Sequence, residues 1–503
     1  MRLQRVSPEL RSGEALEGMR VAWGKVTAGE IARAMQGDVV SGDPRTRIAG
    51  VGTDTRALSP GKIFWALRGE RFDGHDFLDQ ALEQGAVGVV AEADALRGRS
   101  FSENAVAIAV ADTLKALGDL AGWWRHAHGV RVAVLTGSAG KTTTKEMASG
   151  ILSLDEKTLH NPGNFNNLIG LPLTLLDLRE EHRRAVLEMG MNHPGEIARL
   201  TEIADPDVGL ITNVARAHLE GLGDVRAVAR AKAELLDGMS PKGTAVLNGD
   251  DPLLMNEALR FRGRVLTFGL RGDNDMQAER IRDLGRKGIA FVLHYEEHEE
   301  EIRLNVPGRQ NVMNALAAAA LSTAMGVSIP IMVQGLAAFQ GIPGRFSLLD
   351  LPGGGLLVDD TYNANPSSLR AALDSLAPLV RGQGRVIAGL GDMLELGRET
   401  VPAHLEAGRM VAERGVHEIL ALGDHAEEVV RGAVEGGLPL ERARIVQTHE
   451  EMANGIHTLL RDGDVVLLKA SRGMRLDRVV ELLTGMEKGG ASRGREEKSP
   501  GGG

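Results

Sequence analysis

Cysteine is absent from this chain of 503 residues, and aromatic side chains make up only 3% of it. Without thiols, a cysteine nucleophile, disulfide bonds and cysteine-ligated metal sites are excluded. The sequence also lacks any apolar stretch near the roughly 18 residues that a membrane span requires, and it shows no signal-peptide pattern. We therefore expect a cytoplasmic protein that does not insert into a membrane.

Positive charge is in the minority, because 58 lysines and arginines stand against 68 aspartates and glutamates, a net charge of −10. Nucleic-acid backbones are bound by basic faces, so this balance argues against a nucleic-acid partner. Any phosphate that the chain binds is expected to be held by loops and metal ions. The length exceeds what one hydrophobic core accommodates and predicts about three domains.

The most informative stretch begins at Val132. An aliphatic run ends at Thr136, a loop with two glycines follows, and a helical pattern begins at Lys141. Strand, glycine loop and helix in this order are typical of a phosphate-binding loop, in which backbone N–H groups and the helix N-terminus hold phosphate oxygens. In such a loop Lys141 reaches the β- and γ-phosphates, and the Thr142 hydroxyl binds Mg²⁺. The loop is a variant, because Leu135 occupies the position of the usual first glycine.

Alternating strands and helices predict an α/β fold with three domains. Residues 21–112 are expected to form a small α/β domain, with a helix at Ala28–Met35 and strands at Val51–Thr53, Ile63–Leu67, Val87–Ala91 and Ala105–Val110. Residues 113–343 predict a mostly parallel, helix-covered sheet with helices at Leu114–His126, Asp224–Asp237 and Asn311–Leu321, strands at Ala185–Glu188, Val208–Thr212, Ala245–Leu247 and Val265–Phe268, and an added β element at Glu301–Val306. Residues 344–487 predict a second doubly wound sheet with strands at Leu356–Asp359, Val386–Leu390, Ile419–Leu422, Ile445–Thr448 and Val465–Lys469. Residues 1–20 and 488–503 are expected to be disordered tails.

Three residues of the middle domain are candidate metal ligands. Glu188 ends a buried strand, where it either meets a cation such as Mg²⁺ or turns to solvent. His218 follows another strand, and a single histidine is more often structural than a ligand. Lys232 falls on the apolar face of the helix Asp224–Asp237, where it either extends outward or occupies a site. Burial would favour its neutral amine, which can take up CO₂ as a carbamate and so become a metal ligand.

Polar loops supply the remaining candidates. The run Asn161–Asn167 carries several amides, which suit uracil or sugar edges and suit a turn equally well. Thr53–Arg56 and Phe64–Phe77 place polar groups beside aromatic ones, as ligand-binding loops do, although solvated turns capped by Asp and Thr have the same composition.

Taken together, these segments resemble the Mur ligases, the ATP-dependent amide-forming enzymes of peptidoglycan precursor synthesis. The resemblance covers about Val26 to Leu483 and rests on Thr136–Thr142, Leu187–Gly190, Ala217–Glu220, Ala231–Glu234, Gly308–Asn314 and Gly344–Arg345. Phe64–Phe77, Asn161–Asn167 and Asp359–Pro366 are similar to segments of the member that adds D-alanyl-D-alanine. Ala215-Arg216, Ala470 and Asp477 depart from the family pattern.

The resemblance implies a small N-terminal α/β domain that binds a UDP-sugar, a central P-loop ATPase-type domain and a C-terminal Rossmann-like domain, with closure at a hinge near Gly341–Phe346. It implies ATP, a pair of Mg²⁺ ions, and a catalytic set of Lys141, Glu188, His218 and carbamylated Lys232, with Thr142, Glu188, His218 and Lys232 as metal ligands. The implied ATP contacts are Thr136, Gly137, Ser138, Ala139, Gly140, Lys141, Thr142, Thr143, Asn311, Asn314, Arg345 and Asp360. The implied substrate contacts are Thr53, Asp54, Arg56, Asn161, Asn164, Asn166, Asn167, Tyr362, Asn363 and Asn365.

The implied partners are UDP-N-acetylmuramoyl-tripeptide and D-alanyl-D-alanine, acting on a monomer. Two alternatives remain at this stage. The same ligase chemistry can serve another acceptor, as in folate polyglutamylation. Alternatively, the chain is a nucleotide-dependent binding module without catalysis, although the presence of Lys141, Glu188, His218 and Lys232 argues against that.

Overall fold

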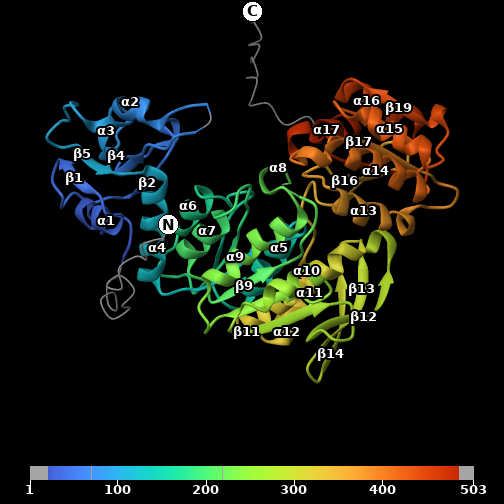
Figure 1. The fold of residues 1–503 in the computed structure, drawn as a ribbon, viewed down its shortest axis with the longest axis horizontal. Helices are drawn as coiled ribbons and strands as arrows, with labels where there is room; N and C mark the ends of the chain where they lie inside the picture. The colour runs from blue at the N-terminus through green and yellow to red at the C-terminus, as the bar shows by residue number, and fades with distance from the viewer. Residues whose placement is uncertain (1–20, 70, 218, 486–503) are drawn as a thin grey trace, which may run out of the picture. The chain divides into compact units, whose positions relative to one another are not determined.

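Three β-sheets organise the residues that the computed structural model describes, which are 21–69, 71–217 and 219–485 (Figure 1). The predicted tails, residues 1–20 and 488–503, therefore lie outside the described residues. The chain divides into two compact units. One comprises residues up to 280 with 291–302 and 313–339, and the other comprises 281–290, 303–312 and the residues from 340 onward. Within the described ranges, no helix is both long and apolar enough to cross a membrane.

The first domain is built on a five-stranded sheet with the order β1-β5-β4-β3-β2, in which only β1 is antiparallel to its neighbour. Helix α1 begins at a capping box, because Thr27 accepts the N–H of Glu30 and the Glu30 carboxylate accepts the N–H of Thr27. The four predicted strands are confirmed, and β1 was not predicted because its four residues are half exposed. The strands are β1 (Asp38–Ser41), β2 (Gly50–Gly52), β3 (Lys62–Trp65), β4 (Gly88–Glu92) and β5 (Val106–Val110), and the helices are α1 (Ala28–Ala34), η3 (Thr55–Ala57), η4 (Gly74–Phe77), α2 (Leu78–Glu83) and α3 (Ala93–Leu96).

Helix α4 (Thr113–His128) connects this domain to the central one. Its Trp124 is fully buried and stacks on Trp23 with ring centroids 4.2 Å apart. One hydrophobic cluster includes Ile63 of the first sheet, Trp124, and Leu187 of the central sheet. The two sheets of this unit therefore share a continuous core.

The central sheet has nine strands in the order β14-β13-β12-β11-β10-β9-β6-β8-β7, and every pair from β12 to β7 is parallel. This confirms the predicted parallel, helix-covered sheet. The strands are β6 (Arg131–Thr136), β7 (Thr158–His160), β8 (Arg184–Glu188), β9 (Val208–Ile211), β10 (Thr244–Asn248), β11 (Arg264–Gly269), β12 (Met276–Asp283), β13 (Ile289–Tyr295) and β14 (His298–Leu304). The helices are α5 (Lys141–Asp155), α6 (Gly170–Leu175), α7 (Glu196–Ala204), α8 (Leu219–Leu222), α9 (Val225–Gly238), α10 (Pro252–Ala258), η5 (Gly285–Lys287), α11 (Arg309–Ala324) and α12 (Ile329–Ala338).

The end of this sheet contains more β-structure than the single added element expected at Glu301–Val306. Strands β12, β13 and β14 lie side by side, and only two glutamates, Glu296 and Glu297, separate β13 from β14. Glu296 adopts a φ of 54°, which hairpin turns more often assign to Asn or Gly. The usual turn signal is therefore missing from the sequence, and the hairpin was not predicted.

The C-terminal domain is a six-stranded sheet with the order β15-β16-β20-β17-β18-β19, parallel except for β15. The five predicted strands and the Rossmann-like architecture are confirmed, while the short edge strand β15 was not predicted. The strands are β15 (Ser347–Asp350), β16 (Leu356–Asp360), β17 (Val386–Gly391), β18 (Glu418–Leu422), β19 (Ala443–Val446) and β20 (Val465–Lys469), and the helices are α13 (Pro366–Asp374), η6 (Ala377–Leu379), η7 (Gly397–Glu399), α14 (Thr400–Glu413), α15 (Ala426–Glu435), η8 (Leu440–Arg442), α16 (His449–Leu459), η9 (Arg472–Met474) and α17 (Asp477–Thr484). Because β20 lies between β16 and β17, the polar residues that end these three strands meet at one edge of the sheet.

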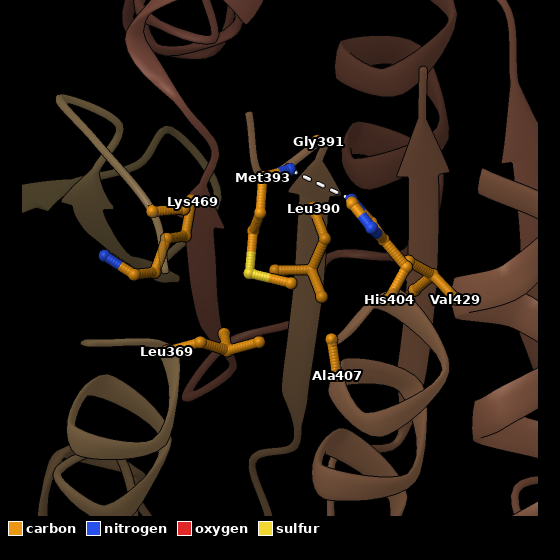
Figure 2. Close-up of a pocket in the computed structure, with 9 residues that line it drawn as sticks. Leu369, Leu390, Gly391, Met393, His404, Ala407, Val429 and Lys469 are labelled. Carbon is orange, nitrogen blue, oxygen red and sulfur yellow. Dashed lines mark hydrogen bonds between the residues drawn. The ribbon is translucent and has the colours of Figure 1, made fainter. Parts of the chain in front are cut away.

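His404 of α14 is a fully buried histidine in this domain. Its Nε2 accepts the N–H of Met393 at 2.9 Å (Figure 2), and its Nδ1 lies 2.6 Å from the carbonyl of Thr400. The ring also lies beside His425, with centroids 4.7 Å apart, and 3.8 Å from a carboxylate oxygen of Asp392. An imidazole that accepts at one nitrogen and donates at the other is neutral. Burial lowers the pKa of His404 accordingly.

A pH dependence of stability follows for the C-terminal domain. Between the lowered folded pKa and the unfolded pKa of about 6.5, the unfolded chain binds the extra proton, so stability is full above that range and falls as the pH decreases through it. We expect His404→Gln to weaken this acid sensitivity, measured as the unfolding midpoint in denaturant from pH 5 to 8. His457→Gln, which alters an exposed histidine of α16, is the control and should keep the wild-type pH dependence. An unchanged pH dependence in His404→Gln would contradict the assignment.

Candidate active site

The phosphate loop joins β6 to α5 and has two glycines that no other residue can replace without strain. Gly137 and Gly140 have φ values of 151° and 80°. A Cβ on Gly137 would lie 1.8 Å from Thr212 Oγ1, and one on Gly140 would lie 2.3 Å from Asn314 Oδ1. Helix α5 begins directly after Gly140 without a side-chain cap, as helices that bind anions at their N-termini do. The structure thus confirms strand, glycine loop and helix, and it places Asn314 against the loop.

The strand end of β9 holds the phosphate loop in place. The N–H groups of Ser138 and Ala139 donate to the backbone and side-chain oxygens of Asn213, at 3.1 and 3.0 Å. Thr212 Oγ1 donates to the carbonyl of Ala139 at 2.7 Å. Lys141 folds back over the loop and donates from Nζ to the carbonyl of Gly137 at 2.7 Å. Asn213 was not among the predicted site residues, and its position just past the end of a predicted strand is the signal that could have identified it.

Glu188 ends β8, whose neighbour β6 leads into the phosphate loop, and it pairs in register with Leu135. Its side chain is 2% exposed. Oε1 accepts a hydrogen bond from Asn166 Nδ2 at 2.8 Å, whereas Oε2 is buried and has no hydrogen-bond partner among the described residues. A buried carboxylate oxygen without a donor is costly, and a cation would satisfy it. The alternative in which Glu188 turns to solvent is therefore excluded.

Lys232 lies on α9, which begins where Asp224 caps the N–H of Ala227. The side chain is 1% exposed, so it does not extend to solvent. Burial, and then the positive charge of Lys141, lower its pKa well below the ordinary value for a lysine. Both effects shift the protonation equilibrium of Lys232 toward the neutral amine.

Lys141 therefore begins the helix after the phosphate loop, Glu188 ends the strand beside the one that leads into it, and Lys232 is buried on α9. Thr142, the second residue of α5, is buried. The fourth predicted ligand, His218, lies outside the described residues. Across the described part of the chain, no group of three or more His, Cys, Asp or Glu side chains is arranged to hold a metal ion.

The asparagines of residues 161–167 have separate roles. Asn161 is completely buried, and Asn166 bonds to Glu188. Asn167 Oδ1 accepts the N–H groups of Ile169 and Gly170 ahead of α6. Asn164 is exposed next to Phe165, whose side chain is 47% exposed. Substrate contacts by Asn164, Asn166 and Asn167 stay a prediction, whereas the predicted contact by Asn161 is wrong because its side chain is fully buried.

In the first domain, the Asp54 and Arg56 side chains are exposed and paired with each other at 2.6 Å. Asp54 also accepts the N–H of Arg56 and so begins η3. The Arg56 hydrogen bond lowers the pKa of Asp54 to about 2. Thr53 is exposed beside them. The three predicted residues share one surface loop, and their contact with a substrate stays a prediction.

A second group of predicted residues lies at the strand edge of the C-terminal sheet. Lys469 Nζ donates to Asp360 Oδ2 at 2.6 Å and to the carbonyl of Asn363 at 3.0 Å. Burial raises the pKa of Asp360, although the charge of Lys469 opposes the shift. Figure 2 shows the Lys469 amine directed away from the apolar side chains of Leu390 and Met393. The aliphatic part of Lys469 therefore lines a small pocket, while its ammonium group pairs with the Asp360 carboxylate.

At this edge of the sheet, two arginine side chains lie against the ring of Tyr362. The guanidinium of Arg345 lies 3.9 Å from the Tyr362 ring centroid, and that of Arg472 lies 5.1 Å from it. Arg472 also donates to the Tyr362 hydroxyl at 2.9 Å.

Asn365 caps α13. Lys469 and Arg472 were not among the predicted site residues, although their place at the end of a predicted strand was the available signal. Asn311, on α11, donates to the carbonyl of Pro307 at 2.7 Å.

Comparison with known proteins accounts for the whole arrangement. Three stretches match Mur ligase domain families: residues 47–124 match the Mur ligase family catalytic domain, 135–322 the Mur ligase middle domain, and 344–472 the Mur ligase glutamate ligase domain. A UDP-N-acetylmuramoyl-tripeptide--D-alanyl-D-alanine ligase of Escherichia coli (strain K12) is 36% identical over 462 residues, which cover 91% of this chain and 98% of that one. The protein of the same name from Bacillus subtilis (strain 168) is 36% identical over 465 residues, with the same coverage.

Solved structures agree with these relatives. A crystal structure of MurF from Acinetobacter baumannii has a TM-score of 0.83 and 34% identity, and the match covers 93% of this chain and 100% of that one. MurF ligase from Thermotoga maritima in complex with ADP has a TM-score of 0.77 and 29% identity, with coverage of 87% and 97%. The likeness is therefore nearly full-length in sequence and in fold, and this chain belongs to the Mur ligase family.

Proposed function

We propose that this chain is the ATP-dependent ligase that joins D-alanyl-D-alanine to UDP-N-acetylmuramoyl-tripeptide, giving the UDP-N-acetylmuramoyl-pentapeptide, ADP and phosphate. The observation that carries the proposal is the likeness, over nearly the whole of both chains, to ligases that bear this name. The reaction belongs to peptidoglycan precursor synthesis and hence to cell-wall formation, cell shape and cell division.

The reaction requires two steps because a carboxylate is a poor acyl donor. The terminal carboxylate of the tripeptide first attacks the γ-phosphorus of ATP, and the bond from that phosphorus to the β,γ-bridging oxygen breaks, releasing ADP. The amine of D-alanyl-D-alanine then attacks the acyl carbon, the bond to the phosphate oxygen breaks, and the amine nitrogen loses a proton. Transfer of this kind depends on neutralised charge and in-line placement.

The residues around the phosphate loop suit the first step. The Lys141 ammonium and the N-terminus of α5 place positive charge where the β- and γ-phosphates would lie. The bonds from Thr212 and Asn213 fix the loop before ATP arrives, so little ordering is required on binding. Asn314, beside Gly140, is positioned to contact the nucleotide.

Thr142, Glu188 and carbamylated Lys232 would hold Mg²⁺, and the family resemblance adds His218 to this ligand set. The ion would supply positive charge to neutralise phosphate oxygens and to orient the acceptor carboxylate. Lys232 becomes a suitable ligand when its neutral amine adds to CO₂: an N–C bond forms, one proton leaves, and a carbamate anion results. The low pKa of Lys232 supports this step, because only the neutral amine has the lone pair that it requires.

The other domains have complementary tasks in this proposal. Residues 21–112 hold the UDP-sugar, with Thr53, Asp54 and Arg56 among the contacts. Residues 113–343 hold ATP, and residues 344–487 bring in the dipeptide, with Arg345 and Asp360 toward the nucleotide and Tyr362, Asn363 and Asn365 toward the substrate. Closure at residues 341–346 excludes water from the acyl phosphate. The enzyme acts as a monomer in the cytoplasm.

The carbamate is directly testable. We expect a carbamate ¹³C signal from wild-type protein in ¹³C-bicarbonate, and we expect Lys232→Ala to lose it together with about 100-fold of kcat. Lys242→Ala, which removes an exposed lysine beyond the end of α9, is the matched control and should retain both. Wild-type protein that is active yet gives no carbamate signal would refute the modification.

Substrate choice separates the proposal from its alternatives. We expect phosphate release only when ATP, UDP-N-acetylmuramoyl-tripeptide and D-alanyl-D-alanine are all present, followed by a coupled phosphate assay. Turnover with a single amino acid in place of the dipeptide, or with a folate acceptor and glutamate, would assign a different ligase. Nucleotide binding without turnover on any acceptor would favour a binding module.

A further inference from the structure

Asn161 is the residue whose environment departs most from its predicted role as a substrate contact. Its side chain is 0% exposed. Nδ2 donates to the carbonyls of Phe165 and Glu188 at 2.9 and 3.0 Å, and Oδ1 accepts the N–H of Glu188 at 2.9 Å. Both amide hydrogens are thus used inside the protein. The side chain has no surface on which a substrate can dock.

The bonds to Glu188 extend the sheet by one position. Strand β7 ends at His160, which pairs with Val186 of β8. Glu188 lies two residues further along β8. There the side-chain amide of Asn161 takes the place of a neighbouring strand and bonds both the N–H and the carbonyl of Glu188. Leu135 of β6 faces Glu188 from the other side. The last residue of β8 is therefore held from both sides, although β7 itself is too short to reach it.

The same amide also shapes the turn that touches the Glu188 carboxylate. Its bond to the Phe165 carbonyl closes the turn that presents Asn166. Asn166 then bonds Glu188 Oε1 with its side chain and accepts the N–H of Gly190 with its carbonyl, at 2.8 and 2.7 Å. Asn161 consequently determines the position of the Glu188 main chain and, through Asn166, the direction of its carboxylate.

Lys145 connects the Asn161–Glu188 contact to the helix that follows the phosphate loop. It lies one helical turn after Lys141 on α5, is 0% exposed, and donates from Nζ to the carbonyl of Asn161 at 2.6 Å. Its charge is balanced by Glu146 at 2.8 Å, a carboxylate that is 32% exposed. One helix thus supplies both the lysine of the phosphate loop and the lysine that anchors Asn161.

We propose that Asn161 and Lys145 are positioning residues that hold the Glu188 carboxylate in register with the phosphate loop, so that a divalent cation bound there meets a fixed oxygen. The inference rests on the proposed function in one respect, the assignment of Glu188 as a metal ligand. Neither residue touches the substrates. Their effect is on cation affinity, and partners that orient a ligand in this way typically change metal affinity by about 10- to 100-fold.

The test measures Mn²⁺ binding to the full chain in the presence of ADP, from the electron paramagnetic resonance signal of free Mn²⁺. We expect Asn161→Ala to weaken Mn²⁺ binding about 10-fold or more. In the assay, its Mg²⁺ activation constant should rise while kcat recovers at high Mg²⁺. Asn274→Ala is the matched control, because Asn274 is 5% exposed and also donates two hydrogen bonds from its amide, to Asp250 and Arg271. This control should lower stability and leave Mn²⁺ binding unchanged.

Further variants keep the test decisive. Should Asn161→Ala not fold, Lys145→Met removes the anchor of the Asn161 carbonyl, together with the ion pair to Glu146, and should weaken Mn²⁺ binding in the same direction. Glu188→Gln distinguishes a failure of the metal assignment from a failure of the positioning role. Weaker Mn²⁺ binding in Glu188→Gln, but wild-type affinity in both Asn161→Ala and Lys145→Met, would overturn the positioning role alone. Wild-type affinity in Glu188→Gln would overturn the metal assignment and the positioning role with it.

Discussion

The central domain depends on a buried carboxylate that its own fold leaves incompletely satisfied. Parallel pairing of β8 with β6 places Glu188 beside the strand that leads into the phosphate loop. Among the described residues, Asn166 provides one donor for one of the two carboxylate oxygens, and the other has no partner. An unpaired charge in a protein interior costs several kcal/mol, so the fold is arranged to receive positive charge at this point. Burial of Lys232 likewise shifts that side chain away from its cationic form.

The site is held by side chains that replace backbone at the ends of strands. Asn213 provides oxygens to the phosphate loop, Asn161 continues the ladder past β7, and Asp360 accepts the N–H of Phe346 in the C-terminal domain. In parallel sheets the carboxyl ends of the strands are where hydrogen bonding stops and ligands enter. Amide and carboxylate side chains at those ends keep loop geometry fixed without closing the edge to ligands.

Much of this fold could be predicted from the sequence because its main strands are buried on both faces and have continuous apolar runs. Strands such as β6, β9 and β20 were predicted on that basis, to within a few residues. Strands β1 and β15 are short and partly exposed, so their patterns resemble loops. The hairpin of β13 and β14 has a turn of two glutamates in place of a glycine or asparagine signal.

Site residues could be predicted where a side chain is chemically unusual for its position in the sequence pattern. Glu188 and Lys232 are polar residues within apolar patterns, which is conspicuous in a sequence. Asn161 was also identified as important, but a sequence shows only that an amide is present, and burial decides whether it faces a ligand or the protein. Lys145 could not be predicted, because its partner is a backbone carbonyl whose location depends on the tertiary fold.

The two outer strands of the central sheet explain how so wide a sheet avoids recruiting strands from other molecules. At one side β7 spans only three residues, too few to template a partner. At the other side β14 carries three consecutive glutamates after His298, most of them turned to solvent. Short edges and like charges both disfavour intermolecular strand addition. Both edges of the central sheet thus disfavour edge-to-edge polymerisation, a safeguard separate from anything its ligands provide.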